Sequence, residues 1–338
     1  RLARAEAALA NFADRWGAAV VTSPAGKGVF DEASPLSAGT YGGYGNPTAH
    51  RAVGEADLIV AVGTKLSASD TVGADPALID PARQTLIQIE IEPRNLSWTM
   101  PVRHPLQGDA AAVLAALAEA APAERDAKGW FSPQQVARTV AFPASSGDAG
   151  LHAPQIIAAM QETLPADSIF TCDAGENRIF MMHYFRARGI GRFSQPAGAG
   201  PMGYAIPSAV AQKLLNPDTP VVAVAGDGGF SMTMNGLITA IEADAPIIVV
   251  VMNNHALGWS QHSRGPFATS FAEFDYAAVA RGMGCAGRKV LNADELVEAL
   301  REAAETTGRG GRPFVIDVET SMDFSFAALA YASTRKPD

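Results

Sequence analysis

The sequence is short of the features that mark secreted, membrane and nucleic-acid-binding proteins. Two cysteines, Cys172 and Cys285, are too few for a disulfide scaffold in a chain of 338 residues. No apolar run approaches the roughly 18 residues that cross a bilayer, and the charged, alanine-rich residues 1–10, which we expect to be helical, have no signal-peptide pattern. The net charge of −9 weighs against nucleic acid and membrane surfaces as partners. We therefore expect a cytoplasmic protein.

The length and the 48% hydrophobic content allow two domains, each with its own core. Both halves alternate short apolar runs with helical stretches, which predicts the α/β class with two doubly wound parallel-sheet domains. Residues 122–150 mix charge, proline, serine and glycine and are typical of a linker. The predicted organisation is a first domain over 1–121, a linker over 122–150, a second domain over 151–322 and a tail over 323–338.

The apolar and helical patterns also predict individual elements. In the first domain we expect strands at 18–22, 58–63 and 86–91 and helices at 47–55 and 110–121. In the second domain we expect strands at 168–171, 221–225, 247–252 and 313–318 and helices at 152–163, 177–185, 204–215, 230–243, 276–282 and 293–306.

The most informative segment is the strand–helix–strand unit from Val221 to Trp259. The first strand is followed by the turn Gly226-Asp227-Gly228-Gly229, and the second strand ends at Asn253-Asn254. Parallel strands joined by a crossover helix have their carboxyl ends at the same edge of the sheet. Asp227 and Asn254, with 26 residues between them, should therefore face each other there.

This pair of side chains has a chemical use. Carboxylate and amide oxygens suit Mg²⁺ or Ca²⁺, and the helix predicted to begin near Phe230 would favour a phosphate at its amino end. The simpler interpretation, that the glycines form only a turn and the asparagines only a loop, does not explain the buried strand before each half. The full spacing favours a divalent metal that bridges Asp227, Asn254 and a diphosphate.

The GDG motif, followed after about two dozen residues by NN, resembles the signature of thiamine-diphosphate-dependent enzymes. Gly200 to Pro207 resembles the glycine-rich segment of that family before the cofactor helix, and Cys172 to Asn177 resembles the strand end that meets the diphosphate. Residues 1–121 resemble the central domain, so the resemblance covers nearly the whole chain. It is closest to the acetolactate synthase and 2-oxo-acid decarboxylase group.

The resemblance implies specific roles for residues of this sequence. Mg²⁺ would be held by the side chains of Asp227 and Asn254 and by the main-chain carbonyl of Ala256. Met202 would hold thiamine diphosphate bent, and the carbonyl of Gly200 would accept a hydrogen bond from its 4′-amino group. The implied cofactor-binding set is Glu176, Asn177, Gly200, Met202, Gly226, Asp227, Gly228, Gly229, Asn254, Ala256, Leu257 and Gly258.

Two of these positions depart from the family. Glu176 and Asn177 stand where related synthases carry Gln and His near the diphosphate. Because a carboxylate beside a diphosphate is repulsive, we expect Glu176 to face solvent or a cation while its backbone N–H binds. Asn177 could still donate a hydrogen bond.

The resemblance places the substrate pocket just after the asparagine pair. His255, Gln261 and His262 are the catalytic candidates there, since histidine moves protons near neutral pH. Some decarboxylases carry a glutamate in this helix, where this sequence has Ser260. The implied function is a decarboxylase or, somewhat better supported, a carboligase that acts on a 2-oxo acid. The alternatives are a lyase for another donor (a 2-hydroxy ketone, an oxalyl thioester or a sulfonated aldehyde) and a non-catalytic nucleotide- or flavin-binding module.

Two further expectations concern groups outside this signature. The central domain of acetolactate synthases holds FAD. In this sequence, Gly39, Gly42, Gly43 and Gly45 would let the backbone come close to a neighbouring group, and a ligand is one such group. The flavin-associated stretch is replaced here by residues 63–70, GTKLSASD, so a domain that only packs is at least as well supported.

The family's catalytic glutamate lies on an amino-terminal pyrimidine-binding domain of a neighbouring subunit. This sequence begins with Arg and has no segment that resembles that domain, so we expect it to act as part of a longer protein or with a partner chain, in a dimer or tetramer.

Overall fold

The computed structural model describes residues 3–122, 131–132, 140–142, 150–308 and 310–334. The chain divides into two compact units, one of residues 1–140 with 329–338 and one of residues 141–328. Most of the predicted linker, 122–150, lies outside the described residues. The predicted tail contains the helical turn Phe326–Leu329 and α12 (Tyr331–Thr334).

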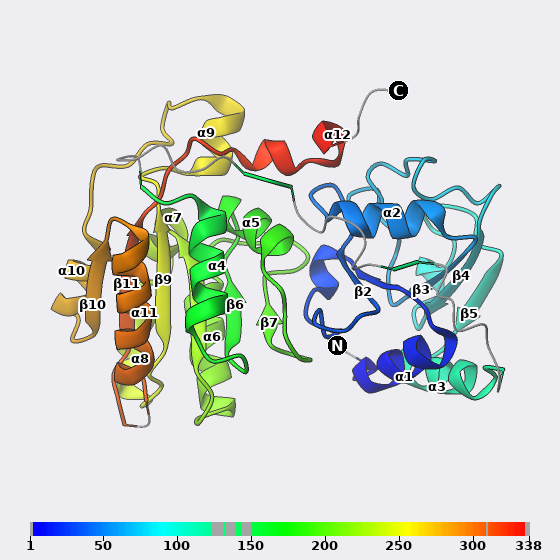
Figure 1. The fold of residues 1–338 in the computed structure, drawn as a ribbon, viewed down its shortest axis with the longest axis horizontal. Coiled ribbons are helices and arrows are strands. Elements are labelled where there is room, and N and C mark those ends of the chain that lie inside the picture. Colours follow the sequence, from blue (N-terminus) through cyan, green and yellow to red (C-terminus); the bar gives the residue numbers. More distant parts are fainter. Residues whose placement is uncertain (1–2, 123–130, 133–139, 143–149, 309, 335–338) are drawn as a thin grey trace. The chain divides into compact units, whose positions relative to one another are not determined.

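The first unit has two small parallel sheets. The sheets have the orders β1-β2 and β3-β4-β5. Its elements in chain order are α1 (Glu6–Trp16), β1 (Val20–Thr22), β2 (Ser37–Thr40), α2 (Pro47–Glu55), β3 (Leu58–Val62), β4 (Thr85–Glu90), β5 (His104–Gln107) and α3 (Ala110–Glu119), with 3₁₀ turns at Pro24–Gly26 and Pro93–Asn95. Figure 1 shows α2 on one side of the strands and α1 with α3 on the other.

The parallel α/β architecture is confirmed, with corrections of detail in this unit. β2 (sequence SAGT) and β5 (sequence HPLQ) were missed because neither has the apolar β-branched residues typical of buried strands. The helix predicted over residues 1–10 instead runs from Glu6 to Trp16. It ends where Gly17, at φ 62°, adopts the left-handed conformation and donates its N–H to the last turn. Its buried Phe12 packs in one cluster with Ile89 and Leu114.

The second unit is built on one six-stranded parallel sheet of order β10-β11-β9-β8-β6-β7. Its elements are α4 (Ala153–Thr163), β6 (Ile169–Cys172), α5 (Glu176–Tyr184), β7 (Phe193–Ser194), α6 (Ala205–Leu215), β8 (Val221–Gly226), α7 (Asp227–Thr233), α8 (Gly236–Glu242), β9 (Ile248–Asn253), α9 (Gly258–Arg264), α10 (Tyr276–Gly282), β10 (Ala286–Val290), α11 (Ala293–Thr306) and β11 (Phe314–Glu319).

Helices cover both faces of this sheet because its strands are apolar on both faces. Val221, Ala223 and Ala225 of β8 pack in one buried cluster with residues of α6, α8 and α10. Their neighbours Val222 and Val224 point to the other face, on the side of α5. Figure 1 shows α4 and α11 beside each other in front of the strands. The doubly wound arrangement predicted for this domain is the one that the structure has.

The crossover helix predicted at 230–243 is wrong in its bounds and continuity. It begins at Asp227 and is divided into α7 and α8 at Met234 and Asn235. The N–H groups of Leu237 and Ile238 bond three residues back, so the chain tightens locally. At Gly236 an added Cβ would lie 3.0 Å from Ile206 Cγ2, which shows how closely this point packs against α6.

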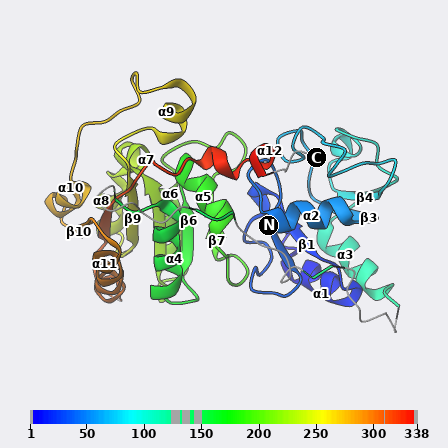
Figure 2. The ribbon, with the colours of Figure 1, turned by 45° about the horizontal axis from the view of Figure 1, so that its top comes forward.

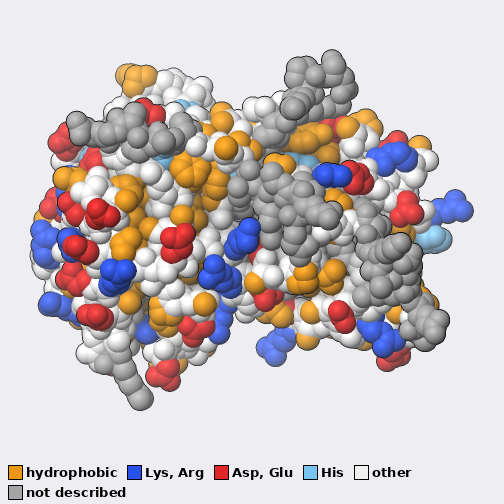
Figure 3. Space-filling view, in the orientation of Figure 1, with side chains coloured by type: hydrophobic (Ala, Val, Ile, Leu, Met, Phe, Trp, Pro, Cys, Tyr) orange, Lys and Arg blue, Asp and Glu red, His pale blue; other side chains and the backbone are white. Residues whose placement is uncertain are grey.

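The segments after β8 and β9 lie at one end of the sheet. Figure 2 shows α7 and α9 beyond the same end of the strands. Figure 3 shows acidic and basic side chains interspersed over the visible face of this unit, so the net negative charge is not gathered there in one patch. Within the described residues, no helix has the length and apolar character of a membrane span.

Candidate active site

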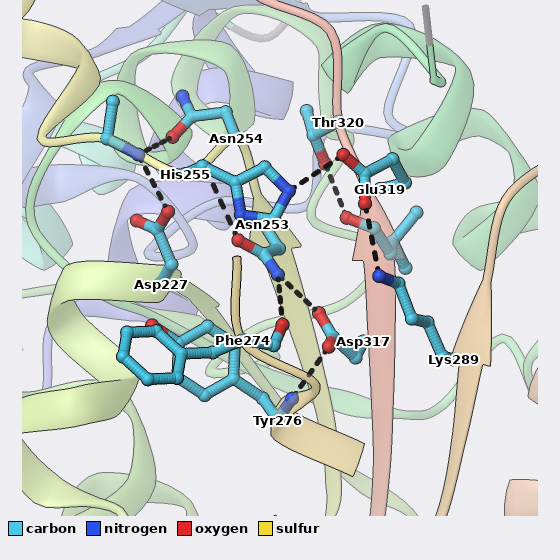
Figure 4. Close-up of polar contacts among 12 residues, drawn as sticks. Asp227, Asn253, Asn254, His255, Phe274, Tyr276, Lys289, Asp317, Glu319 and Thr320 are labelled. Carbon is cyan, nitrogen blue, oxygen red and sulfur yellow. Dashed lines mark hydrogen bonds and ion pairs between the residues drawn. The ribbon is translucent and has the colours of Figure 1, made fainter. Parts of the chain in front are cut away.

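Asp227 and Asn254 meet at the carboxyl edge of the six-stranded sheet. β8 and β9 pair in parallel up to Gly226 and Met252, so the residues that follow them emerge side by side. The main-chain N–H of Ala256 donates to Asp227 Oδ2 at 2.9 Å and to Asn254 Oδ1 at 3.2 Å (Figure 4). The structure thus brings together the three residues that the resemblance assigns to Mg²⁺.

The carboxylate of Asp227 is buried. The residue is 2% exposed, and burial raises its pKa to about 6, although the N–H groups of Gly228 and Ala256 act in the opposite direction. A buried carboxylate is costly unless a positive charge is near it. The nearby His255 lowers the pKa of Asp227 electrostatically. The carboxylate of Asp227, the amide oxygen of Asn254 and the carbonyl of Ala256 are hard oxygens, and such a donor set fits Mg²⁺.

Gly228 sits where the backbone must come close to other groups. A Cβ at this position would lie 2.7 Å from Leu257 Cδ2 and 3.0 Å from Met202 Cε. Gly228, Met202 and Leu257, which come from three separate segments, therefore converge. A bulky apolar side chain beside the glycine turn is the arrangement that the Met202 prediction requires.

Asp173 holds the Met202 loop in place, a role that the sequence analysis missed. Its carboxylate accepts the N–H groups of Ala174 at 2.7 Å, Gly203 at 2.8 Å and Ala205 at 3.3 Å. It is fully buried, and burial raises its pKa while these hydrogen bonds lower it. Its position directly after a buried strand, like that of Asp227, was the available signal.

Glu176 does not face solvent, so that part of the expectation is wrong. It is 8% exposed. Its Oε1 accepts the N–H of Phe326 at 3.5 Å and lies 3.3 Å from His262 Nε2, while its Oε2 has no hydrogen-bond partner in the described part of the chain. Burial, and to a smaller extent the charge of Asp227, raises the pKa of Glu176 to about 7. The carboxyl group is thus a buried part of the site.

Asn177 and Gly200 lie beside the strand ends but are engaged with the chain itself. Asn177 Nδ2 donates to the carbonyl of Asp173 at 3.2 Å, and its Oδ1 would lie 3.6 Å from a Cβ on Gly226. Gly200 has φ 62°, and a Cβ there would lie 3.0 Å from Arg178 Nη1. Gly229 similarly adjoins Asp173, and a Cβ on Gly258 would collide with Glu176 Oε2.

The three catalytic candidates have different surroundings. His262 pairs with Glu176, and burial lowers its pKa. His255 Nε2 lies 2.8 Å from Glu319 Oε1, and the other oxygen of Glu319 pairs with Lys289 Nζ at 3.5 Å (Figure 4). Gln261 Oε1 accepts the hydroxyl groups of Thr269 and Ser270, each at 3.4 Å. Among the side-chain hydrogen bonds and ion pairs of the described residues, His262 is the one candidate whose side chain pairs with a residue of the predicted cofactor set, Glu176.

A second buried network supports the end of β9. Asn253 Nδ2 donates to Asp317 Oδ1 at 3.0 Å, and the N–H of Tyr276 donates to Asp317 Oδ2 at 2.8 Å (Figure 4). Burial raises the pKa of Asp317. This pairing could not be predicted from the sequence, because the two side chains are 64 residues apart and no local pattern links them.

The glycine-rich segment of the first unit is covered by residues of the same unit. Tyr331 donates its N–H to the carbonyl of Gly43 at 2.8 Å, and its ring lies 4.7 Å from that of His50. His50 Nε2 in turn lies 2.8 Å from the carbonyl of Gly42. At Gly45 a Cβ would collide with the carbonyl of Thr40, so close approach here is to the chain's own backbone.

Each of the two units contains residues that match a model of a known protein family. The family model described as "Thiamine pyrophosphate enzyme, C-terminal TPP binding domain" matches residues 173–318, and the one described as "Thiamine pyrophosphate enzyme, central domain" matches residues 1–117. Thiamine pyrophosphate is another name for thiamine diphosphate.

Curated relatives match most of the chain. A putative thiamine pyrophosphate-containing protein, YdaP, of Bacillus subtilis is 31% identical over 93% of this chain and 54% of its own length. A probable 2-ketoarginine decarboxylase, AruI, of Pseudomonas aeruginosa is 32% identical over 89% and 54%. A probable acetolactate synthase large subunit of Methanocaldococcus jannaschii is 29% identical over 88% and 52%. The chain spans about half the length of these relatives. Together with the converging Asp227 and Asn254, these matches show that the chain belongs to the thiamine pyrophosphate enzyme family, in the group of acetolactate synthases and related decarboxylases.

Proposed function

We propose that this chain is the central and diphosphate-binding part of a thiamine-diphosphate- and Mg²⁺-dependent enzyme that acts on a 2-oxo acid as a carboligase or decarboxylase. The observation that carries the proposal is the convergence of Asp227 Oδ2 and Asn254 Oδ1 on the N–H of Ala256. Two hard oxygens at adjacent strand ends supply a metal site where a diphosphate can reach it.

The residues around that point divide the work of holding the cofactor. The side chains of Asp227 and Asn254 and the carbonyl of Ala256 would hold Mg²⁺. Met202, fixed through the Asp173–Gly203 hydrogen bond, would press against the cofactor from the side of Gly228. When bound, thiamine diphosphate supplies the nucleophilic carbon for attack on a carbonyl. The chain supplies orientation and a buried environment.

Acid–base roles near this point fall to Glu176 and His262. Their side chains lie 3.3 Å apart; that of Glu176 is 9% exposed and that of His262 is 22% exposed. One proton can be held between Glu176 Oε1 and His262 Nε2 near neutral pH, because burial disfavours the charged form of each group. We assign these two residues to proton holding and not to metal binding.

Ser260, in place of the glutamate of some decarboxylases, supports a carboligase over a simple pyruvate decarboxylase. A panel of 2-oxo acids, with and without an acceptor aldehyde or second 2-oxo acid, separates the two by product. The same panel, extended to a 2-hydroxy ketone, an oxalyl thioester and a sulfonated aldehyde, tests the other donors. We further propose a cytoplasmic oligomer in which a pyrimidine-binding domain or partner chain completes the site.

The deciding experiment for the cofactor is calorimetric titration of thiamine diphosphate with and without Mg²⁺. We expect binding that requires Mg²⁺ and falls at least tenfold in Asp227→Asn. Asp227 is buried, so Asp227→Ala would also disturb the fold, and the isosteric change is the better probe. Asp167→Asn, on an exposed loop, is the control and should bind like the unmodified chain. Unchanged affinity in Asp227→Asn would remove the metal site from the proposal.

A further inference from the structure

A small pocket lies at the amino end of β6, at the edge of the sheet opposite the candidate active site. Its lining includes the apolar side chains of Met160, Leu164, Phe170 and Phe185. Arg186, Arg188 and Arg192, from the loop between α5 and β7, also line it. Three cations beside apolar side chains have no role in the proposed reaction, because the cofactor residues lie at the carboxyl ends of the strands.

The backbone that carries these arginines is held by specific hydrogen bonds. The side chain of Gln161 bonds both main-chain groups of Arg186, accepting its N–H at 3.2 Å and donating to its carbonyl at 3.3 Å. The carbonyl of Arg192 accepts the N–H of Phe170 at 2.9 Å. The rings of Phe170 and Phe185, which also line the pocket, lie 4.5 Å apart. Both ends of the loop are therefore positioned before any ligand arrives.

Within the described residues, the guanidinium groups and one hydroxyl of the pocket lack partners. Over the described ranges, none of the three guanidinium groups forms an ion pair. Arg186 and Arg188 are exposed and Arg192 is half-buried. The hydroxyl of Ser168, which also lines the pocket, is different: the residue is 2% exposed, and its Oγ has no hydrogen-bond partner among the described residues. A buried hydroxyl without a partner is costly and points to a ligand that completes it.

We propose that this pocket binds the phosphate group of a small phosphate-containing ligand. A guanidinium offers a planar fork of donors that matches phosphate oxygens. Three such forks and one hydroxyl suit a group with several acceptor oxygens better than a carboxylate with two. The nearest acidic residues along the chain, Glu162 and Asp167, are exposed and form no ion pair with the arginines. The proposal is independent of the reaction assigned to the other edge of the sheet.

The test is calorimetric titration of the whole chain with inorganic phosphate, AMP and acetate in low-chloride buffer. We expect saturable binding of phosphate or AMP and at least tenfold weaker binding of acetate. Arg188→Ala and Arg192→Ala should each weaken the phosphate-containing ligand about tenfold, and Ser168→Ala about threefold. Arg301→Ala, an exposed arginine on α11, is the matched control and should stay within twofold.

Each arm of the titration has a defined meaning. Tighter binding of AMP than of phosphate identifies a phosphate ester as the ligand, and equal binding identifies free phosphate. Thermal melting checks that each variant is folded, so a loss of binding can be assigned to the site. Absence of saturable binding to both phosphate and AMP, or an equal loss in Arg301→Ala, would overturn the proposal.

Discussion

The carboxylate of Asp173 accepts the main-chain N–H of Gly203 at 2.8 Å and so ties the end of β6 to the loop that carries Met202. The same carboxylate also receives N–H groups from Ala174 and Ala205. One buried side chain thus positions a loop that begins about 30 residues away along the chain.

Replacement of Asp173 by Asn should loosen this loop. The amide has the size of the carboxylate, but its NH₂ group cannot accept the N–H donors, so we expect a loss of about 1–3 kcal/mol in unfolding free energy. Affinity for thiamine diphosphate should fall with it. Urea unfolding and calorimetry measure the two effects. Asp167→Asn is the exposed control, and an equal response in both variants would show that Asp173 does not act through the loop.

Met202→Ala should lower turnover by the complete enzyme more than affinity for the cofactor. The metal and diphosphate contacts are retained, and what is lost is the apolar side chain that packs beside Gly228. Steady-state titration with thiamine diphosphate separates the maximal rate from the half-saturating concentration. Met232→Ala, whose side chain is exposed, serves as the control. Full turnover in Met202→Ala would assign Met202 to packing alone.

Asp317→Ala should destabilise the second unit strongly. It removes the acceptor of the buried Tyr276 N–H and one of the two acceptors of Asn253 Nδ2, which keeps only the carbonyl of Phe274 at 3.3 Å. We expect the free energy of unfolding to fall by about 3 kcal/mol, which is within the range for breaking a buried polar network. Equilibrium unfolding in urea measures it against Asp294→Ala, an exposed aspartate on α11. A change below about 1 kcal/mol would mean that water replaces the lost acceptor.

Glu176→Gln should alter how stability depends on pH in the chain without cofactor. The folded-state pKa of Glu176 is raised to about 7 from the usual 4.5, so its contribution to stability is fully present below pH 4.5 and is lost as pH rises through 7. The difference corresponds to roughly 3 kcal/mol. The Gln variant should therefore gain stability relative to the unmodified chain at pH 8 and little at pH 4.

Urea unfolding at these two pH values gives the comparison. Glu162→Gln, exposed on α4, controls for the removal of one negative charge. The same gain at both pH values would show that ionisation of Glu176 is not the cause.

Local sequence was sufficient for the elements with strong apolar periodicity and for the meeting of Asp227 with Asn254. α10 and α11 have the predicted bounds. Asp227 and Asn254 meet because a crossover between neighbouring parallel strands brings their carboxyl ends to one edge, whatever else the chain does. The spacing also favoured a metal and a diphosphate at that edge. The identification of the ligand as thiamine diphosphate came from the family resemblance, and the family is confirmed by the comparisons.

Tertiary structure alone decided the features that depend on distant segments. Glu176 is buried because Phe326, 150 residues away, and His262 pack over it. Asp317 finds Asn253 across neighbouring strands, and contact with Ile206 sets the close packing at Gly236 in the divided crossover helix. Periodicity reports which face of an element is apolar, and chain direction reports where its ends lie. Neither reports which side chain from elsewhere arrives beside a given polar group, and that decides its burial and charge.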